Sequence, residues 1–368
     1  MKRSLILAIV LLISSCIFAQ TRDTIHFERI TGLIRIPVVV NGEVHYYMFD
    51  SGAEQSVIRE DGAAKLEKAA GFGVRMKDSQ DNVTWQPKYL IPSLKIGSSE
   101  ISDLKVVSFP DSPLFHCMGI EGVIGVDIIR QFDWLIDFDK QYIVKMDVSD
   151  TLKALKDFVS LDFYTRRLRP MIKLKTGSKV IDYLFDCGAN VNGIEKKSYK
   201  KVKGEIIKSY DEVSASSGAS SFFNQSNETA FVIATQPDPS ATTTYNAMFN
   251  TISEGENKIG NEFWGRNQVF LSWTKSKLLF RPANPEKEKT FGVFFRLIDS
   301  ALVVTSMTFT DPIIKTGLKA GDKVKSINGR TFKDSCELIT YQFLSKEETL
   351  VIEAEDGRKF TLKRESQY

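Results

Sequence analysis

The sequence has few of the residues on which metal-dependent and nucleophilic catalysis usually rely. Its 368 residues include three histidines and four cysteines. No His-Glu-x-x-His motif, Cys-x-x-Cys pair, Gly-x-Ser-x-Gly elbow or Gly-rich nucleotide-binding loop is present in the sequence. His116 and Cys117 are neighbours, but a catalytic Cys/His pair is assembled from distant parts of a chain, so we interpret both as structural. We therefore expect neither a metal nor a cofactor.

The sequence also has little net charge. Its formal net charge is +3, and the charged residues, 26% of the chain, are of both signs and interspersed. We therefore expect no nucleic-acid partner. The hydrophobic content of 42% is ordinary for a globular protein, and a chain of this length predicts two or three domains.

Long hydrophobic runs are missing, and the chain begins with a short one. Lys2 and Arg3 precede the apolar run Leu5–Ile13, and small residues follow it. This pattern is typical of a signal peptide, because so short a run cannot span a bilayer. No later stretch is long and apolar enough for a transmembrane helix. We therefore predict a signal peptide over residues 1–19 and an exported protein.

Two cleavage sites fit this segment. Residues 13–16 resemble a bacterial lipobox, and cleavage there would leave a lipidated Cys16 as an outer-membrane anchor. Cleavage after Ala19 would instead begin a periplasmic or secreted protein at Gln20, and we favour this site. Three further cysteines lie in separate regions: Cys117, Cys187 and Cys336. Export would permit their oxidation, but their odd number argues against a disulfide framework.

What the sequence does contain is an internal repeat. Residues 48–53 read Met-Phe-Asp-Ser-Gly-Ala, and residues 184–189 read Leu-Phe-Asp-Cys-Gly-Ala. Each hexapeptide follows two strand-like runs joined by a turn signal, Asn41-Gly42 in the first copy and Thr176-Gly177 in the second. The plan before the hexapeptide is therefore the same in both copies.

A second matched pair lies downstream of each hexapeptide. Gly125 ends the tripeptide Val-Ile-Gly 75 residues after Asp50, and Gly260 ends Lys-Ile-Gly 74 residues after Asp186. This shared spacing indicates two copies of one β-rich lobe, over about residues 30–148 and 165–282.

Each copy also has a polar stretch at a matching position. These stretches are Lys77–Trp85 and Ser214–Phe223. Two interpretations have equal weight for each: the tip of a hairpin that covers a cleft, or an ordinary surface loop.

Each hexapeptide places an aspartate at the end of a buried strand, where burial raises the pKa of a carboxyl group. The three residues that follow supply a side-chain donor, a glycine for a tight turn and a small alanine: Ser51, Gly52 and Ala53 in one copy, Cys187, Gly188 and Ala189 in the other. A twofold arrangement of the lobes would bring Asp50 and Asp186 face to face, and two such carboxyl groups share a proton. One could then activate water while the other protonates a carbonyl oxygen, which hydrolyses an amide.

The two hexapeptides resemble the Asp-Thr/Ser-Gly-Ala motif of the retropepsin-like aspartic proteases. The downstream tripeptides that end at Gly125 and Gly260 resemble that family's element behind the catalytic loop. The resemblance covers both lobes and implies a mainly β, bilobal fold of duplicated retropepsin-like acid-protease β-barrels. It further implies that Asp50 and Asp186 are the catalytic dyad, supported by the neighbouring loop residues and the two glycines, and that peptides or proteins are the substrates.

Two residues of the second lobe depart from the family pattern. Cys187 stands where a serine or threonine is expected, and a thiol is a weaker hydrogen-bond donor. Lys258 stands where the tripeptide has an apolar residue. These departures motivate an alternative: a catalytically degenerate peptide-binding protein that retains the protease fold.

A separate C-terminal domain is predicted beyond a polar segment with two prolines. The run Gly317–Gly329 resembles the signature of bacterial-type PDZ domains, which are small α+β domains. The resemblance implies that residues 291–294 form a loop that binds peptide C-termini, and that the stretch Asp334–Leu344 forms the other wall of the groove. The loop residues are Phe291, Gly292, Val293 and Phe294; a plain core strand is the alternative for them.

The predicted organisation therefore has five parts. They are a signal peptide (1–19), a first protease lobe (20–150), a second protease lobe (151–282), a linker (283–290) and a PDZ domain (291–368).

Overall fold

The computed structural model describes residues 23–366 apart from residues 72, 78–82, 110–112, 147–154, 156, 177–178, 203–208, 218–221, 236–243, 253–254, 284–288, 308–315 and 320. The predicted signal peptide with Cys16, and most of the predicted linker, lie outside the described residues. The fold is mainly β, as predicted. None of the helices described is both long and apolar enough to cross a membrane.

The first lobe, residues 23–146, is built on an eight-stranded sheet in the order β2-β3-β4-β11-β5-β10-β9-β6. Asn41 and Gly42 both have positive φ, 51° and 92°, and form the predicted hairpin turn between β3 and β4. The elements of this lobe are β1 (Asp23–His26), β2 (Glu28–Ile30), β3 (Leu33–Val40), β4 (Glu43–Phe49), β5 (Val57–Arg59), α2 (Glu60–Ala63), β6 (Glu67–Lys68), β7 (Val74–Lys77), β8 (Val83–Gln86), β9 (Lys88–Ile96), β10 (Ser99–Phe109), α3 (Pro113–Cys117), β11 (Gly122–Ile124), α4 (Val126–Ile129), β12 (Asp133–Asp137) and β13 (Tyr142–Met146).

The second lobe, residues 157–283, repeats this order of strands. The hairpin β15–β16 corresponds to β3–β4, and β21 runs parallel to β16 as β11 runs parallel to β4. The elements are β14 (Val159–Arg166), β15 (Arg169–Thr176), β16 (Lys179–Phe185), β17 (Gly193–Glu195), α6 (Lys196–Val202), β18 (Ser209–Ser217), β19 (Phe222–Thr235), β20 (Thr244–Ile252), β21 (Lys258–Ile259), α7 (Asn261–Trp264), β22 (Asn267–Ser272) and β23 (Lys277–Pro282).

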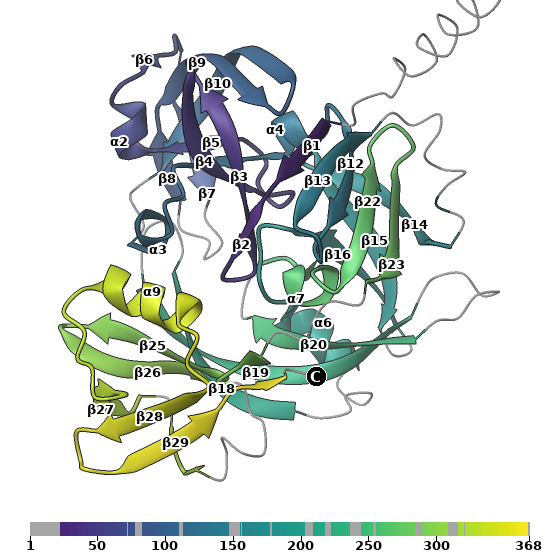
Figure 1. Ribbon diagram of the computed structural model, residues 1–368. Helices are drawn as coiled ribbons and strands as arrows, with labels where there is room; N and C mark the ends of the chain where they lie inside the picture. The colour runs from purple at the N-terminus through teal and green to yellow at the C-terminus, as the bar shows by residue number, and fades with distance from the viewer. Residues whose placement is uncertain are drawn as a thin grey trace, which may run out of the picture.

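The lobes are joined by a run of six strands in the order β1-β13-β12-β22-β23-β14. Three of these strands come from each lobe, and the central pair, β12 and β22, is antiparallel, with Leu135 opposite Phe270. In Figure 1, β13, β12, β22 and β23 of this layer lie side by side at the upper right. Because one buried apolar core continues from the first lobe through this layer into the second, the lobes form one packed unit.

The C-terminal region has its own core around a five-stranded sheet, β25-β26-β27-β28-β29, and the helix α9. Its elements are β24 (Lys289–Thr290), β25 (Val293–Ile298), β26 (Ala301–Met307), β27 (Lys323–Ile327), α9 (Ser335–Leu344), β28 (Thr349–Ala354), β29 (Lys359–Lys363) and β30 (Glu365–Ser366). The stretch Asp334–Leu344 forms the helix α9, and Asp334 is its N-cap, because the Asp334 carboxylate accepts the N–H of Glu337 at 2.8 Å.

One turn in this region differs from expectation. The sequence predicts that Asn328-Gly329 joins two strands, and both residues do have positive φ, 49° and 74°. The turn leads, however, to a single bridge between Ile327 and Arg330 rather than to a second strand. The chain then continues to α9, and the side chain of Asn328 bonds to the Tyr341 hydroxyl of that helix and to the backbone of Thr349 and Val351.

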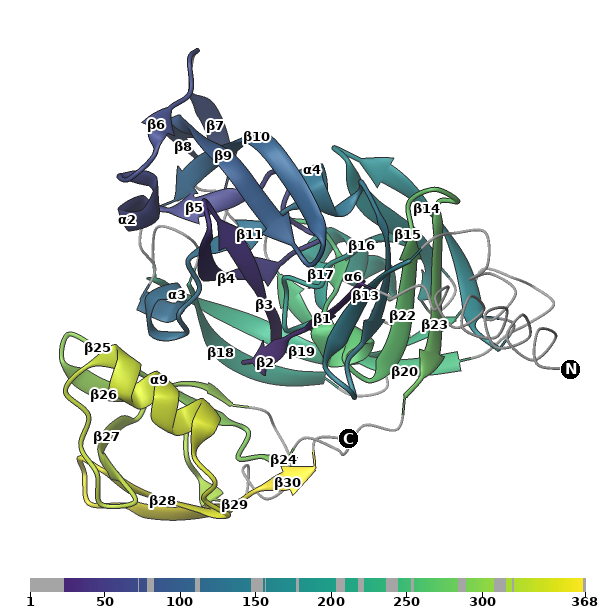
Figure 2. The ribbon, with the colours of Figure 1, turned by 45° about the horizontal axis from the view of Figure 1, so that its top comes forward.

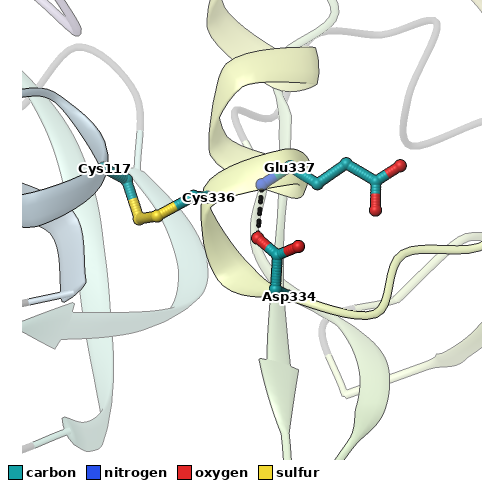
Figure 3. Close-up of a disulfide and its surroundings, with 4 residues drawn as sticks. All are labelled: Cys117, Asp334, Cys336 and Glu337. Carbon is teal, nitrogen blue, oxygen red and sulfur yellow. Dashed lines mark hydrogen bonds between the residues drawn. A yellow bond between two sulfur atoms is a disulfide. The ribbon is translucent and has the colours of Figure 1, made fainter.

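A disulfide fixes α9 to the first lobe. It joins Cys117 at the end of α3 to Cys336 in the first turn of α9, which are 219 residues apart in sequence (Figure 3). Figure 2 also shows α9 on the side of the C-terminal sheet that faces α3. Beside the disulfide, Ile339 of α9 packs on an apolar cluster of the first lobe that includes Met48 and Met118.

The disulfide corrects the expectation drawn from the odd number of cysteines. Two of the three form a bond between parts of the chain that only the folded structure brings together, and Cys187 is left as a buried free thiol. Sequence spacing carries no signal for such a bond, because the contact depends on how α9 docks on the first lobe.

Thiol counting tests this arrangement. In the denatured, unreduced chain from Gln20 to Tyr368, we expect one reactive thiol, that of Cys187, and three after reduction. Cys336→Ser should expose the thiol of Cys117 without reduction and so raise the unreduced count from one to two. Three thiols in the unreduced wild-type chain would contradict the disulfide.

Candidate active site

The two predicted aspartates lie at the ends of equivalent strands and are brought together between the lobes. Asp50 directly follows β4, and Asp186 directly follows β16. A methyl group placed on Gly188 would lie 2.2 Å from Asp50 Oδ1, and one placed on Gly52 would lie 2.5 Å from Asp186 Oδ1. Each glycine therefore lies directly against the opposite carboxyl group, and any side chain at either position would collide with it.

The residues after the aspartates bind the two loops to each other. The buried Ser51 hydroxyl donates a hydrogen bond to the Phe185 carbonyl at 2.7 Å and accepts one from the Cys187 N–H at 3.0 Å. In return, the Cys187 sulfur accepts from the Ser51 N–H at 3.3 Å and donates to the Phe49 carbonyl at 3.4 Å. The cysteine thus makes the same pair of contacts as the serine, only longer.

The carboxyl groups are also held by their own loops. Asp50 Oδ1 accepts the N–H groups of Gly52 at 2.6 Å and Ala53 at 3.1 Å, and Asp186 Oδ1 accepts that of Gly188 at 3.1 Å. The carboxyl group of Asp186 is buried, whereas Asp50 is partly exposed. The backbone therefore sets the direction in which each carboxyl group points.

Burial and the neighbouring carboxylate govern the electrostatics of the site. Although residue Asp50 is partly exposed, its carboxyl group lies against Gly188 of the opposite loop. Burial of that carboxyl group, followed by repulsion from Asp186, raises the pKa of Asp50 to about 7, whereas the loop N–H groups and Lys258 act in the opposite direction. Burial also raises the pKa of the Cys187 thiol, which therefore stays neutral. A site with these properties holds one proton on the aspartate pair up to near-neutral pH.

The predicted supporting glycines lie behind the loops in matching positions. The Gly125 N–H donates to Ser56 Oγ at 3.0 Å, and the Gly260 N–H donates to Asn192 Oδ1 at 2.9 Å. Added side chains would collide with backbone in both places, 2.6 Å from the Gln55 carbonyl carbon and 2.5 Å from the Val191 carbonyl oxygen. The carbonyls of Ala53 and Ala189 accept the N–H of the residue after each glycine, at 2.9 and 2.8 Å.

Two polar residues of the second lobe add contacts that the sequence analysis did not assign to the site. Lys258 Nζ lies 3.9 Å from Asp186 Oδ2. The Asn261 amide donates to the carbonyls of Cys187 and Gly32, both at 2.8 Å, and so links the second loop to the first lobe. Both residues stand where the first copy of the repeat has valine, and this difference between the copies is the signal that could have marked them.

An ion-pair network also crosses between the lobes next to the first loop. Arg169, at the start of β15, lies 3.5 Å from the Glu54 carboxylate and 2.8 Å from that of Glu256. Arg167 adds a second cation 3.6 Å from Glu54. The network fixes the residue after Ala53 to the hairpin β14–β15 of the second lobe.

Comparison with known families agrees with this architecture. Residues 36–128 match the family model described as aspartyl protease, and residues 290–354 match the one described as PDZ domain. The chain contains an aspartyl protease domain and a PDZ domain. A search of curated proteins finds no match. The aspartyl protease match lies within the first lobe, so the likeness of the second lobe rests on its repeated strands and loops.

The PDZ domain has an edge strand that faces α9. Within the described sheet, β25 is the terminal strand, and the Gln342 side chain of α9 bonds to both backbone groups of Phe295. Gln342 Oε1 accepts the Phe295 N–H at 2.6 Å, and its amide donates to the Phe295 carbonyl at 3.1 Å. Of the predicted loop residues, Phe291 and Val293 are buried, Gly292 has a φ of 63°, and the Phe294 ring faces Phe343 at 6.0 Å.

The two polar stretches both contribute to hairpins. Lys77–Trp85 contains the ends of β7 and β8, with residues 78–82 outside the description, and Trp85 is 71% exposed. Ser214–Phe223 contains the ends of β18 and β19, and residues 218–221 between them are likewise outside the description. β18 lies beside β26 of the PDZ domain. Whether either hairpin covers a cleft stays a prediction.

The contacts of Ser51 and Cys187 should contribute unequally to the free energy of unfolding. Ser51→Ala leaves the buried Cys187 N–H and Phe185 carbonyl without their partner, and we expect it to lower the free energy of unfolding by about 2–4 kcal/mol. Cys187→Ser keeps a donor and an acceptor in place, so its effect should be below about 1 kcal/mol. Urea-induced unfolding measures both. Equal losses for the two variants would contradict the assigned roles.

Proposed function

We propose that this protein is an exported aspartic-type endopeptidase that hydrolyses peptide bonds with water activated between Asp50 and Asp186. The observation that supports this most strongly is the reciprocal packing of the two loops, in which Gly188 lies against Asp50 and Gly52 against Asp186. Two carboxyl groups placed in this way, with one proton between them, are the general acid and general base that amide hydrolysis needs.

The reaction uses one proton of the pair and one water molecule. The water oxygen bonds to the carbonyl carbon, one carboxylate takes a water proton, and the other carboxyl group protonates the carbonyl oxygen. The resulting diol then loses the amine: the C–N bond breaks, the nitrogen takes a proton from one carboxyl group, and a hydroxyl proton returns to the other. The raised pKa of Asp50 favours a pair that still holds its proton near neutral pH.

A second candidate function is peptide binding without cleavage. Cys187 and Lys258 depart from the protease pattern in the second lobe, and both lie at the dyad. A protein with this function would bind peptides without cleaving them, in the wild type as well as when either aspartate is replaced.

The proposed location is outside the cytoplasm, in the periplasm or beyond, with a lipid anchor at Cys16 if cleavage occurs at the lipobox. The signal-peptide pattern of the sequence supports export. The disulfide between Cys117 and Cys336 supports it too, because such bonds persist mainly in oxidising compartments.

The PDZ domain is proposed to bind peptide or protein C-termini along β25. A peptide that adds a strand to this edge needs the outward backbone groups of β25, and Gln342 occupies those of Phe295. Binding at that point therefore requires the Gln342 side chain to turn away. Gln342 thus competes with the peptide for the backbone groups of Phe295.

Peptide cleavage tests the proposed function. We expect the chain from Gln20 to Tyr368 to cleave members of a diverse peptide library, with activity falling as pH rises through about 7, because Asp50 then loses its proton. Asp50→Asn and Asp186→Asn should each reduce kcat by at least about a thousandfold, since either change removes one of the two proton-transfer groups. Mass spectrometry of the products over about pH 3 to 8 measures both effects.

Binding of the same peptides is the control for this experiment. Affinity retained in the asparagine variants, with cleavage lost, fits a peptidase with an intact cleft. Cleavage unchanged in both variants would contradict the assignment of the dyad. Binding without cleavage by the folded wild-type protein at every pH would favour the second candidate function.

Peptide binding at the PDZ domain should strengthen when Gln342 is shortened. Gln342→Ala frees the N–H and carbonyl of Phe295, and we expect about five- to tenfold tighter binding of peptides with free C-termini, as one net hydrogen bond is worth about 1 kcal/mol. Calorimetry on the full chain with Asp50→Asn in the background measures it. The same peptides with amidated C-termini are the control; unchanged or weaker binding by Gln342→Ala would contradict this account of the groove.

A further inference from the structure

Lys258 places a positive charge beside one member of the dyad. It begins β21, which runs parallel to β16, and it pairs in register with Leu184, two residues before Asp186. Its Nζ lies 3.9 Å from Asp186 Oδ2, and the two side chains are 25% and 9% exposed. The sheet register therefore fixes the position of this lysine relative to the carboxyl group.

The first lobe has no charge at the corresponding position. Val123 takes that place, next to Ile124 and Gly125, and is 4% exposed. It packs in the apolar cluster that Met48 and Ile339 of α9 also join. The two lobes therefore present different surroundings to their aspartates, although the loops themselves are equivalent.

The other charged and titratable groups around the loops do not remove this asymmetry. Glu54, Arg169 and Glu256 are engaged with one another in the network between the lobes. Cys187, the remaining titratable group of the second loop, carries a neutral thiol because burial raises its pKa. The ammonium group of Lys258 is thus a charge beside Asp186 that the matching position of the first lobe, Val123, does not supply to Asp50.

We propose that Lys258 is a positioning residue that keeps Asp186 ionised, so that the shared proton rests on Asp50 and the two aspartates have fixed roles. This inference rests on the proposed peptidase function. Asp186 then takes the proton from water as the oxygen bonds to the carbonyl carbon, and Asp50 gives its proton to the carbonyl oxygen. When the C–N bond breaks, the nitrogen takes the proton from Asp186, and a diol hydroxyl returns a proton to Asp50.

The raised pKa of Asp50 agrees with this assignment, because burial and the charge of Asp186 keep the proton there. Lys258 lowers the pKa of Asp50 from a still higher value, so it also limits the pH at which that proton is lost. A cation within about 4–6 Å of a carboxyl group favours its ionised form and lowers its pKa by about one pH unit or more. The lysine should therefore move the whole activity range of the pair toward lower pH.

The pH profile of kcat/KM tests the role of Lys258. Lys258→Val gives the second lobe the residue that the first lobe has, and we expect both limbs of its profile to move upward by about one pH unit or more. Lys258→Arg keeps the charge and should restore the wild-type profile. Lys179→Val, an exposed change of the same type at the far end of β16, should leave the profile unmoved.

A change in kcat/KM without a shift of either limb in Lys258→Val would overturn the proposal, because it would indicate a packing role alone. A shifted profile in Lys258→Arg as well would also overturn it, since the charge is conserved there.

A second readout does not depend on activity. Lys258 stabilises the ionised pair, so the unfolding temperature of Lys258→Val should match that of the wild type most closely at pH 3 and fall further below it as pH rises to 8. A deficit that is constant over this range would overturn the role of Lys258. If the protein cleaves no peptide, the proposed function fails, while the pH dependence of this deficit still decides whether the lysine acts on the pair.

Discussion

The reciprocal contact between Ser51 and Cys187 is the interaction on which the rest of the site depends. Each side chain bonds to the backbone of the opposite loop, so neither loop can move without the other. This places Gly188 against Asp50 and Gly52 against Asp186, and the repulsion between the two carboxyl groups is then unavoidable. The pairing of β12 with β22 also fixes the lobes relative to each other, and one continuous apolar core extends through both of them.

Much of the fold of the two lobes, and the pairing of their aspartate loops, could be predicted from the repeat. Strand alternation and the Asn41-Gly42 turn specify β3 and β4, and the matching spacing to Gly125 and Gly260 predicts a second copy of the same elements. Local patterns carry this information because strand pairing and tight turns depend on neighbouring residues. The helix α9 was likewise predictable, from its N-cap and its apolar run.

The contacts between distant parts could not be predicted in the same way. The bond from Cys117 to Cys336 depends on how α9 docks on the first lobe, and no local pattern encodes that docking. Gln342 reads in sequence as an ordinary helical residue, yet it closes the edge of β25. Lys258 was visible as a departure from the repeat, but its proximity to Asp186 required the parallel pairing of β21 with β16. The repeat therefore predicts the elements that the two lobes share, but not the contacts made by residues that differ between the copies or lie outside them.

Asp50 and Asp186 are proposed to act as one pair that retains a proton near neutral pH. Carbon-13 NMR of the aspartate carboxyl carbons tests it directly, with the Asp50 resonance assigned from its loss in Asp50→Asn. We expect Asp50 to titrate near pH 7 in the wild-type protein, and its midpoint to fall by at least about one pH unit in Asp186→Asn, because the neighbouring charge is gone. An Asp50 midpoint near 4 in the wild type, unmoved by Asp186→Asn, would contradict the pairing of the two aspartates.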